Sequence, residues 1–358
     1  MLDFLVARDD LRSCRVVESE TPAPAPGQAL LRVDRFAFTA NNVTYALAGD
    51  LLGYWRYFPA PDGWGRVPVW GFAEVIASRH DAATVGDRVF GYLPMSTHLL
   101  VQPQAAGSRA FDDAAPHRAG LPAIYNRYRR LALEGDGAER DRREAERALL
   151  HPLFITGFIL DDFLADNGFF GARAAVISSA SSKTAIGTAQ LLAARKQVAV
   201  VGLTAPERAA FVEGLGCYDR VVPYDRLDQL PADAPAVYLD FAGDAAVTRQ
   251  VHERLADRLA SSLRIGRTHA SAPAGDDGSL PGPRPVMFFA PSQVDKRVRD
   301  WGGDGLQARM AAARQTLAGQ LGWLRIVESR GREAVERVYR EVLDGRVRPD
   351  EGHVLSLI

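Results

Sequence analysis

The sequence has few cysteines, almost no excess charge and no long apolar run. Cys14 and Cys217 are the only cysteines among 358 residues, which excludes a disulfide scaffold and a four-cysteine zinc site. Lys plus Arg (43) nearly balance Asp plus Glu (44), so nucleic acid or an anionic membrane is not expected as a partner. The most apolar stretch, Leu153–Leu160, is far shorter than a membrane span. These absences predict a soluble, cytoplasmic protein that binds a small molecule.

The order of apolar segments predicts two kinds of structure. The first third contains β-type alternation at 29–36, and further strands are expected at Val67–Ala77, Arg88–Tyr92 and Thr97–Val101. The middle third alternates strands with helices. Its strands are expected at Ala174–Ile177, Val198–Val201, Arg220–Val222 and Ala236–Asp240. This alternation is typical of βαβ units and a parallel sheet, so the predicted fold class is α/β.

Two other segments have a distinctive composition. Residues 134–146 are almost entirely charged residues with Ala and Gly, which predicts a solvated helix with i,i+4 ion pairs. The alternative is a helix that binds a protein partner. Near the end of the chain we expect a strand that runs into a loop at Phe288–Ser292, and helices over Gly305–Trp323 and Arg332–Leu343.

Four motifs occur in an order that points to a known superfamily. They are Val85–Gly91 (VGDRVFG), Val176–Leu192 (VISSASSKTAIGTAQLL), Leu215–Val222 (LGCYDRVV) and Leu239–Gly243 (LDFAG). Together they resemble the turn-and-strand, nucleotide-loop and strand-end motifs of medium-chain dehydrogenase/reductases, in the quinone-reductase-like, zinc-independent branch. The segments Thr39–Ala46, Val67–Glu74 and Gly91–Pro94 further resemble a subgroup of that superfamily with no assigned function.

The resemblance implies a β-rich GroES-like domain and a Rossmann doubly wound parallel sheet. We expect the GroES-like domain over residues 1–120 and 305–358, a charged helical insertion over 121–150, and the nucleotide-binding domain over 151–304. The substrate cleft would lie between the two domains.

The nucleotide loop departs from the superfamily pattern. Alignment on Gln190 places Ser179, Ser182, Lys183 and Ala185 where quinone-reductase-like members have glycine, a residue that lets the backbone approach a pyrophosphate. One interpretation is that hydroxyl and ammonium donors replace the lost backbone contacts, supplied by Ser179, Ser181, Ser182, Lys183 and Thr184. The other is that dinucleotide binding has been lost.

The end of the second parallel strand bears on the choice of cofactor. An NAD enzyme places an acid there to hold the ribose 2′-hydroxyl, whereas Gly202-Leu203-Thr204 contains none. Arg208 follows at the start of the next helix. If a dinucleotide binds, NADPH is therefore favoured over NADH, with Arg208 or Lys183 near the 2′-phosphate. Thr204 and Asp240 complete the predicted cofactor site.

Zinc is not expected. The resemblance places Asn41-Asn42 near the catalytic cysteine of zinc-dependent relatives, and Gly71-Phe72-Ala73-Glu74 near their Gly-His-Glu ligand segment. Both the cysteine and the histidine are missing from these positions. His80 and His98 are scattered and do not form a ligand set.

The predicted substrate-binding residues follow the first long strand. Asn42 and Tyr45 offer an amide and a hydroxyl that can polarise a carbonyl oxygen. Tyr54 and Tyr57 lie in an aromatic run, and enoyl-thioester reductases of the superfamily use a tyrosine in this neighbourhood as proton donor. The alternative is that these aromatic residues simply pack the domain junction.

The resemblance implies an NADPH-dependent reductase that needs no zinc, acting on an enone, an enoyl thioester or a quinone. A homodimer is expected by analogy with relatives. The alternative is a homologue that has kept the fold and lost nicotinamide chemistry, and serves as a non-redox enzyme or a binding protein for an acyl or aromatic ligand.

Overall fold

The structure, a computed structural model, describes residues 1–131, 137–266, 280–317 and 319–358. The chain folds into two compact units. The first unit contains Met1–His151, Ile326–Val347 and Glu351–Ile358, and the second contains Pro152–Arg325 and Arg348–Asp350. The first unit is thus assembled from both ends of the chain, and the second unit is inserted between them.

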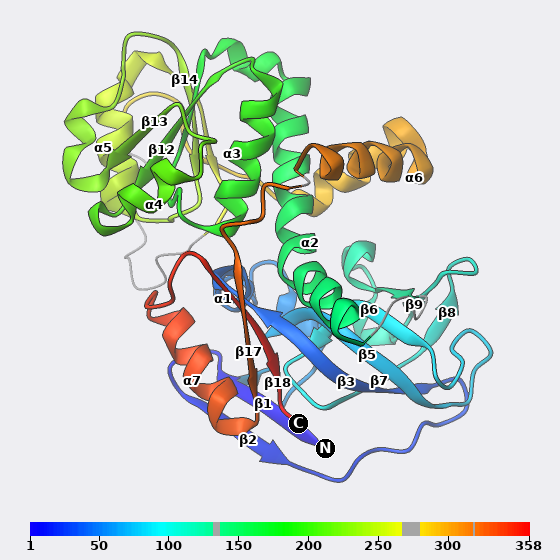
Figure 1. Ribbon diagram of the computed structural model, residues 1–358. Coiled ribbons are helices and arrows are strands. Elements are labelled where there is room, and N and C mark those ends of the chain that lie inside the picture. The colour runs from blue at the N-terminus through cyan, green and yellow to red at the C-terminus, as the bar shows by residue number, and fades with distance from the viewer. Residues whose placement is uncertain (132–136, 267–279, 318) are drawn as a thin grey trace. The chain divides into compact units, whose positions relative to one another are not determined.

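The first unit consists mainly of antiparallel β-structure (Figure 1). Its nine-stranded sheet has the order β17-β18-β3-β5-β6-β10-β9-β8, with β7 also paired to β3. The strands are β3 (Ala29–Phe38), β5 (Pro68–Ser78), β6 (Arg88–Pro94), β7 (His98–Val101), β8 (Pro103–Ala105), β9 (Ala110–Asp113), β10 (Arg127–Arg130), β17 (Arg325–Arg330) and β18 (Glu351–Ser356). A three-stranded sheet, β2-β1-β4, adds β1 (Leu2–Ala7), β2 (Cys14–Glu18) and β4 (Trp64–Gly65).

Strands β3 and β5 form the centre of this unit. Gly71 on β5 pairs with Phe36 on β3, and a Cβ atom at Gly71 would lie 2.3 Å from the carbonyl oxygen of Arg35. Only glycine permits this close approach of the two backbones. The helices α1 (Ala40–Leu47) and α7 (Arg332–Leu343) contact each other beside the sheets.

The second unit contains a six-stranded parallel sheet with the order β13-β12-β11-β14-β15-β16. Its strands are β11 (Ala174–Ile177), β12 (Ala199–Thr204), β13 (Arg220–Pro223), β14 (Ala236–Asp240), β15 (Leu259–Arg264) and β16 (Val286–Met287). The helices are α3 (Lys183–Arg195), α4 (Ala209–Gly214), α5 (Ala245–Leu255) and α6 (Ala290–Leu317). The predicted parallel α/β sheet is confirmed, and the four strands expected from the sequence are β11 to β14.

Two apolar cores cover the two faces of the parallel sheet. One core joins Leu160 and Leu164 of α2 (Gly137–Asp166) with Ala189 of α3 and strand residues such as Ile177. The other joins Val251 of α5 to the opposite face of the sheet. Helices therefore cover both faces, as in a doubly wound sheet.

Helix α2 runs from the first unit into the second, and the division falls between His151 and Pro152. Of the helices that the structure describes, α2 is the one long and apolar enough to cross a membrane. However, 61% of its most apolar window is buried inside the structure, and Leu160 and Leu164 lie in the core. This half of α2 is a core helix.

The charged segment forms the first half of α2, except that residues 132–136 lie outside the described residues. The i,i+4 pairs Arg142–Glu146 and Arg143–Glu139 form as predicted. Glu144, in contrast, is buried and binds Arg88 on β6. This part of α2 is therefore held on the first unit by a buried ion pair and is not solvated on all sides.

Helix α6 differs from the prediction for the end of the chain. A short strand, β16, ends at Met287, and α6 starts at Ala290, so Phe288–Ser292 is not a strand. Gly302 (φ 71°, ψ 165°) has a non-helical backbone, so α6 consists of two helical segments that meet at a sharp kink at this residue. The predicted domain boundary at residue 305 falls inside this helix, and the second unit extends to Arg325.

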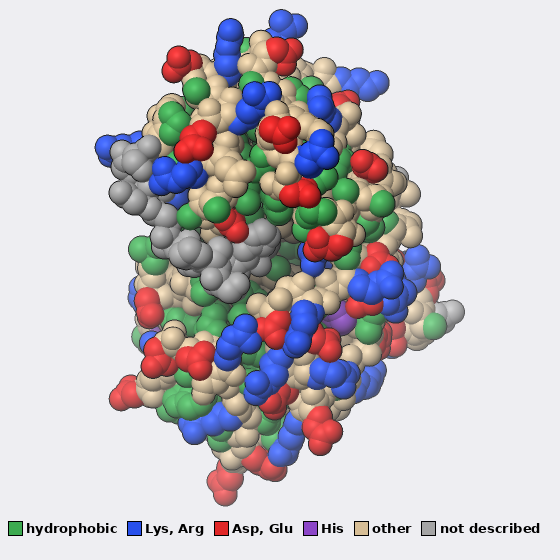
Figure 2. All heavy atoms as spheres, turned by 90° about the vertical axis from the view of Figure 1, so that its left-hand side faces the viewer, with side chains coloured by type: hydrophobic (Ala, Val, Ile, Leu, Met, Phe, Trp, Pro, Cys, Tyr) green, Lys and Arg blue, Asp and Glu red, His purple; other side chains and the backbone are tan. Residues whose placement is uncertain are grey.

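On the face shown in Figure 2, acidic and basic side chains are interspersed over both units. This mixture agrees with the balance of 43 basic and 44 acidic residues in the sequence. It is the pattern of an ordinary solvated surface rather than of a polyanion-binding face.

Candidate functional site

The parallel sheet has a switch point at β11. The chain adds β12 and β13 on one side of β11, and then β14, β15 and β16 on the other. Connections from the carboxyl ends of β11 and β14 therefore diverge, which opens a crevice where doubly wound folds bind ligands. The predicted cofactor-binding residues lie in the loops after β11, β12 and β14.

The loop after β11, residues 178–182, keeps the backbone shape of a glycine-rich turn without its glycine. Ser179 has φ 50°, a left-handed conformation that glycine adopts most easily. Its N–H donates to the hydroxyl of Tyr224 (2.7 Å), and the N–H of Ala180 donates to the carbonyl of Leu203 (2.9 Å). The carbonyl of Ala180 accepts from Tyr218 (2.8 Å). Two tyrosines and β12 thus hold this loop in place.

Two hydroxyls at this edge of the sheet are buried and lack a partner. Within the described residues, neither Ser182 Oγ nor Thr204 Oγ1 has a hydrogen bond. Ser182 precedes α3 as its N-cap residue but makes no side-chain cap bond, and Thr204 ends β12. A buried polar atom without a partner costs about 1–3 kcal/mol. Both hydroxyls are therefore candidates to bind a polar ligand.

Basic and hydroxyl side chains lie around the same loop. Lys183 is the first residue of α3, and its Nζ donates to the carbonyl of Pro349 (3.2 Å). Arg208 Nη1 lies 3.5 Å from Ser181 Oγ, which brings the loops after β11 and β12 together. Thr184 follows Lys183 in the first turn of α3. The positive end of the helix dipole lies in this turn.

Asp240 has a different environment from the one predicted. Its Oδ1 accepts hydrogen bonds from Ser178 Oγ (2.8 Å), Tyr238 Oη (3.3 Å) and the N–H groups of Ala242 and Gly243 (both 3.0 Å). Its Oδ2 accepts from Thr248 Oγ1 (3.3 Å). Burial raises the pKa of the carboxyl, against the opposing effect of these donors. Asp240 therefore holds the loops after β11 and β14 in place through these hydrogen bonds, and it does not present a free carboxylate to a ligand.

Three residues that were not predicted also shape this edge: Ser178, Tyr218 and Tyr224. Ser178 Oγ also accepts from the N–H groups of Phe241 and Ala242. Tyr224 stands directly after β13. Their signal in the sequence is a polar residue close to the end of a predicted parallel strand. The loop that each residue contacts depends on the order of the strands in the sheet, which the sequence does not show.

In the first unit, Asn42 belongs to a helix cap. Thr39 precedes α1, and the Oδ1 atom of Asn42 accepts from the backbone N–H of Thr39 (2.8 Å), forming a capping box. The Nδ2 atom of Asn42 donates to the carbonyl of Pro68 (2.9 Å). The side chain is buried, so the amide holds α1 on β5 and has a structural role.

The three predicted tyrosines come together in one aromatic cluster with two that were not predicted. Tyr45 and Tyr54 have ring centroids 4.6 Å apart, and Tyr92 and Tyr125 have the same separation. Tyr57 lies within 5.4 Å of both Tyr92 and Tyr125. We call these five residues the tyrosine cluster; Trp70 of β5 packs against it (5.3 Å from Tyr92).

Hydrogen bonding within the tyrosine cluster is incomplete. The hydroxyls of Tyr54 and Tyr125 are 3.3 Å apart, Trp70 Nε1 donates to Tyr45 Oη (3.4 Å), and Tyr57 Oη donates to the carbonyl of Pro122 (3.3 Å). The hydroxyl of Tyr92 has no hydrogen-bond partner in the part of the chain that the structure describes.

Burial keeps these phenols protonated. It raises the pKa of Tyr45, Tyr54 and Tyr57, and raises the pKa of Tyr92 and Tyr125 well above the usual value. A phenol with a raised pKa remains a hydrogen-bond donor at neutral pH. The cluster is therefore able to donate hydrogen bonds to a ligand oxygen and unable to act as a base.

A buried ion pair supports the tyrosine cluster. Arg118 Nε lies 2.9 Å from Asp113 Oδ2, and both side chains are buried. The guanidinium also donates to the carbonyl of Tyr125 (3.3 Å) and lies 5.6 Å from the ring centroid of Tyr57. This pair fixes the segment that brings Tyr125 to the other tyrosines.

The described residues contain no group of three His, Cys, Asp or Glu side chains placed to hold a metal ion. Position 41 carries Asn, and position 72 carries the buried Phe72.

Several solved structures have the same fold. CurA from Vibrio vulnificus in complex with NADPH has a TM-score of 0.64 and 14% identity, with 99% of this chain and 98% of that chain covered. A putative NADPH:quinone reductase from Mesorhizobium loti gives the same values. A mycobacterial protein, Rv1454c, complexed with NADPH has a TM-score of 0.60 and 14% identity, with 99% of each chain covered. Comparison with curated protein sequences gave no match.

These likenesses confirm the predicted two-domain α/β fold. They also agree with the predicted placement in a subgroup without assigned function. Residues 36–348 match the model of a family described as "Protein of unknown function (DUF2855)", and because that match spans most of the chain, the protein belongs to this family.

Proposed function

We propose that the protein is an NADPH-dependent reductase, and that NADPH binds at the carboxyl ends of β11, β12 and β14. The observation that carries the proposal is the pair of buried hydroxyls without partners, Ser182 Oγ and Thr204 Oγ1, at the switch point of a parallel sheet. Structural neighbours that hold NADPH support it. The phosphate and ribose oxygens of a dinucleotide are suitable acceptors for such groups.

The proposed cofactor contacts divide between three loops. Ser179, Ser181, Ser182, Lys183 and Thr184 would hold the pyrophosphate after β11. Thr204 and Arg208 would hold the adenosine end, where the lack of an acid at Gly202-Leu203-Thr204 favours a 2′-phosphate. Asp240 would shape the loop and make no direct contact, because both of its oxygens accept bonds from its own unit.

We propose that the substrate is an enone, an enoyl thioester or a quinone. Bound NADPH would supply the hydride. The tyrosine cluster would hold the carbonyl oxygen of the substrate, because its protonated hydroxyls stabilise a developing enolate by hydrogen bonding. Tyr45, Tyr54 and Tyr57 are the proposed donors, and no zinc is required. We further propose that the protein is soluble, cytoplasmic and a homodimer.

One observation favours a second function. The N–H groups of Ser179, Ala180 and Ser182 are all bonded within the protein, whereas a glycine-rich loop directs such groups at a pyrophosphate. This arrangement is what a fold-retaining homologue without nicotinamide chemistry would show. Such a protein would bind an acyl or aromatic ligand and perform no redox step.

Direct binding of nucleotides decides between the two functions. Calorimetry of NADPH and NADH with the full chain should show tight binding of NADPH and weaker binding of NADH. Thr204→Val should weaken NADPH binding about tenfold, which corresponds to one lost hydrogen bond to a charged ligand. Lys183→Ala should have a similar effect, and Lys196→Ala, at the other end of α3, provides the matched control with the same loss of charge.

Single-turnover reduction of an enone or a quinone tests the substrate site. Tyr45→Phe should slow hydride transfer, and Asn42→Ala reports whether the capping amide contributes beyond holding α1. If no nucleotide binds at millimolar concentration, the reductase proposal is wrong and the non-redox function is favoured.

A further inference from the structure

Strand β10 carries three arginines in unequal surroundings. Arg127 Nε donates to Asp112 Oδ1 (2.9 Å), and Arg130 Nε donates to Asp87 Oδ2 (2.8 Å). Arg129 lies between them in sequence, is partly buried, and has no hydrogen bond or ion pair to any residue that the structure describes. A partly desolvated guanidinium that no described carboxylate neutralises is costly, so an anionic ligand would stabilise it.

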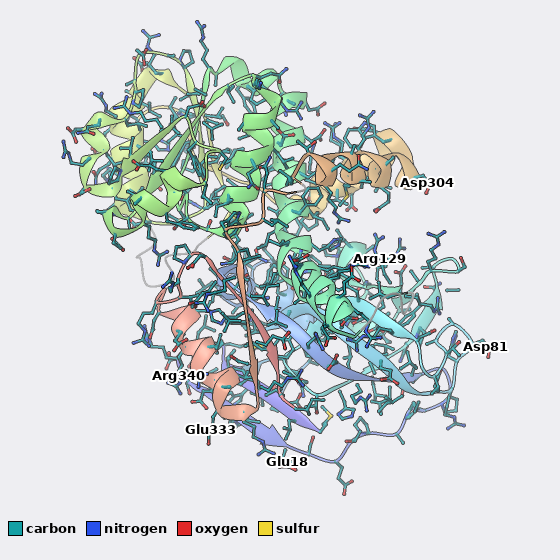
Figure 3. All side chains as sticks on the ribbon, in the orientation of Figure 1. Glu18, Asp81, Arg129, Asp304, Glu333 and Arg340 are labelled. Carbon is teal, nitrogen blue, oxygen red and sulfur yellow. The ribbon has the colours of Figure 1, made fainter. Side chains whose placement is uncertain are left out.

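The sheet register shows what surrounds Arg129. It pairs with Phe90 on β6 and with Ala110 on β9, so these three side chains share one face of the sheet. The first half of α2 lies over the same face, because the guanidinium of Arg147 is 4.8 Å and the ring of His151 is 5.2 Å from the centroid of Phe90. Figure 3 labels Arg129 beside this part of α2.

The described carboxylates near this face bind arginines other than Arg129. Asp34 and Glu144 both bind Arg88, and Asp141 binds Arg35. These carboxylates are therefore committed to other guanidinium groups. The pKa of Arg129 is lowered, first by burial and then by the charge of Arg127. An anion placed at Arg129 would remove both unfavourable effects.

The position of Arg129 relates it to the tyrosine cluster. Tyr92 lies two residues beyond Phe90 on β6, on the same face and diagonal to Arg129 across the β6–β10 ladder. Diagonal neighbours have Cβ atoms about 7 Å apart. On the other side of Arg129, Ala110 contributes only a methyl group. The register therefore places the guanidinium and the nearest ring of the tyrosine cluster on neighbouring strands of the same sheet face.

We propose that Arg129 is an anion-binding subsite of the first unit, and that it recognises the carboxylate or phosphate group of an acidic, unsaturated substrate. This inference rests on the proposed function for the identity of the ligand as a substrate. The planar guanidinium presents two parallel N–H donors, which match the two oxygens of such a group. Arg127, next along the same face, is neutralised by Asp112, so Arg129 supplies the charge for the anion.

The test compares two probes that differ only in charge. Calorimetry measures the binding of trans-cinnamate and of its neutral analogue, trans-cinnamamide, to the full chain without nucleotide. We expect cinnamate to bind at least about tenfold more tightly, as one charge-assisted pair provides. Arg129→Gln should abolish this preference, whereas Arg127→Gln, on the same strand and face, should retain most of it.

Inorganic phosphate separates the two possible sources of the anion. If inorganic phosphate displaces bound cinnamate, the subsite is assigned to a phosphate group. If only carboxylates displace cinnamate, the subsite is assigned to a carboxylate. Thermal melts of both variants confirm that they fold. Equal binding of the two cinnamic probes, absence of binding at millimolar concentration, or a preference that survives Arg129→Gln would each overturn the proposal.

Binding of NADPH is measured separately, so the two proposals fail independently. If the protein binds cinnamate through Arg129 but binds no nucleotide, the proposed anion subsite is supported and the proposed reductase function is refuted. A protein that binds NADPH but shows no preference for cinnamate keeps the reductase function and loses the subsite.

Discussion

Two regions of the molecule, one in each unit, bury polar groups in opposite ways. At the sheet edge of the second unit, a single carboxylate, Asp240, accepts hydrogen bonds from Ser178, Tyr238, Ala242, Gly243 and Thr248. In the tyrosine cluster of the first unit, five phenols share few hydrogen bonds, and the hydroxyl of Tyr92 has no partner among the described residues. The first arrangement fixes a loop in advance, whereas the second leaves donor capacity for a ligand.

The largest effect is expected from alkaline pH. The chain has ten tyrosines, most of them in the first unit, and burial raises the pKa of Tyr92, Tyr125, Tyr218 and Tyr238 well above the usual value. The pKa of Tyr128 is raised to about 12. Above about pH 10 the unfolded chain loses a phenolic proton that the folded chain retains, so the free energy of unfolding falls as pH rises. Between about pH 10 and 12, Tyr128 alone would remove about 3 kcal/mol.

Denaturant titrations at a series of pH values, with phenolate absorbance as a second signal, measure this effect. Phenolate should appear only as the protein unfolds, and the first unit should unfold at lower pH than the second. Phenolate absorbance at pH 10 in the folded protein would show that the tyrosine cluster is open to solvent. That result would contradict the description of its phenols as buried donors.

Removal of the carboxylate of Asp240 should have the next largest effect. Asp240→Ala leaves the buried hydroxyls of Ser178, Tyr238 and Thr248 without their acceptor. We expect a loss of about 3–5 kcal/mol in the free energy of unfolding of the second unit, because each buried unpaired donor is costly. Denaturant unfolding measures the loss. Asp244→Ala, which removes a solvent-side helix cap from α5, is the control and should cost about 1 kcal/mol.

In the tyrosine cluster, removal of a hydroxyl should have the opposite sign. Tyr92→Phe deletes a buried hydroxyl without a described partner, and we expect a gain of about 1 kcal/mol in stability. Tyr54→Phe is the matched control: its hydroxyl lies 3.3 Å from that of Tyr125, so its removal should cost about 1 kcal/mol. Equal losses in the two variants would mean that Tyr92 has a partner in solution.

The smallest effect concerns the backbone of the loop after β11. Ser179→Gly should stabilise the second unit by up to about 1 kcal/mol, because φ is 50° at this residue. Ser182→Gly, at φ −76°, should destabilise it slightly through the added freedom of the unfolded chain. Thermal melts of the two variants measure the difference, and a loss of stability in Ser179→Gly would show that the serine side chain stabilises the turn.

The sequence predicted the framework of the fold well because local patterns determine it. Alternation and βαβ spacing located β3, β5, β6 and β11 to β14, and the motif order indicated the two-domain fold. The helix expected from Gly305 corresponds to the second segment of α6, which follows the non-helical Gly302. The first segment, which starts at Ala290, was not predicted because its sequence was interpreted as a strand and a loop.

The site was predicted less completely because it depends on register. The loop residues Ser179 to Thr184 are contiguous and could be found by alignment, and Thr39 and Asn42 have the spacing of a capping box. Tyr92 and Tyr125, in contrast, reach the cluster only because β6 and β10 are neighbours. Asp240 shows the same limit: its position was predicted, but its role depends on donors from three other segments.

The first unit has a consequence for how the protein is made. His353 of β18 pairs with Phe38 of β3, and β18 also joins β17 to the sheet. Strand β7 covers the start of this edge of β3, at 29–32, but the end of the edge, at 36–38, stays unpaired until nearly the whole chain has left the ribosome. The second unit, contiguous apart from Arg348–Asp350, emerges earlier. An exposed strand edge of this kind is where chains pair wrongly with one another. Chaperones would be needed most in the interval between translation of the second unit and arrival of β18.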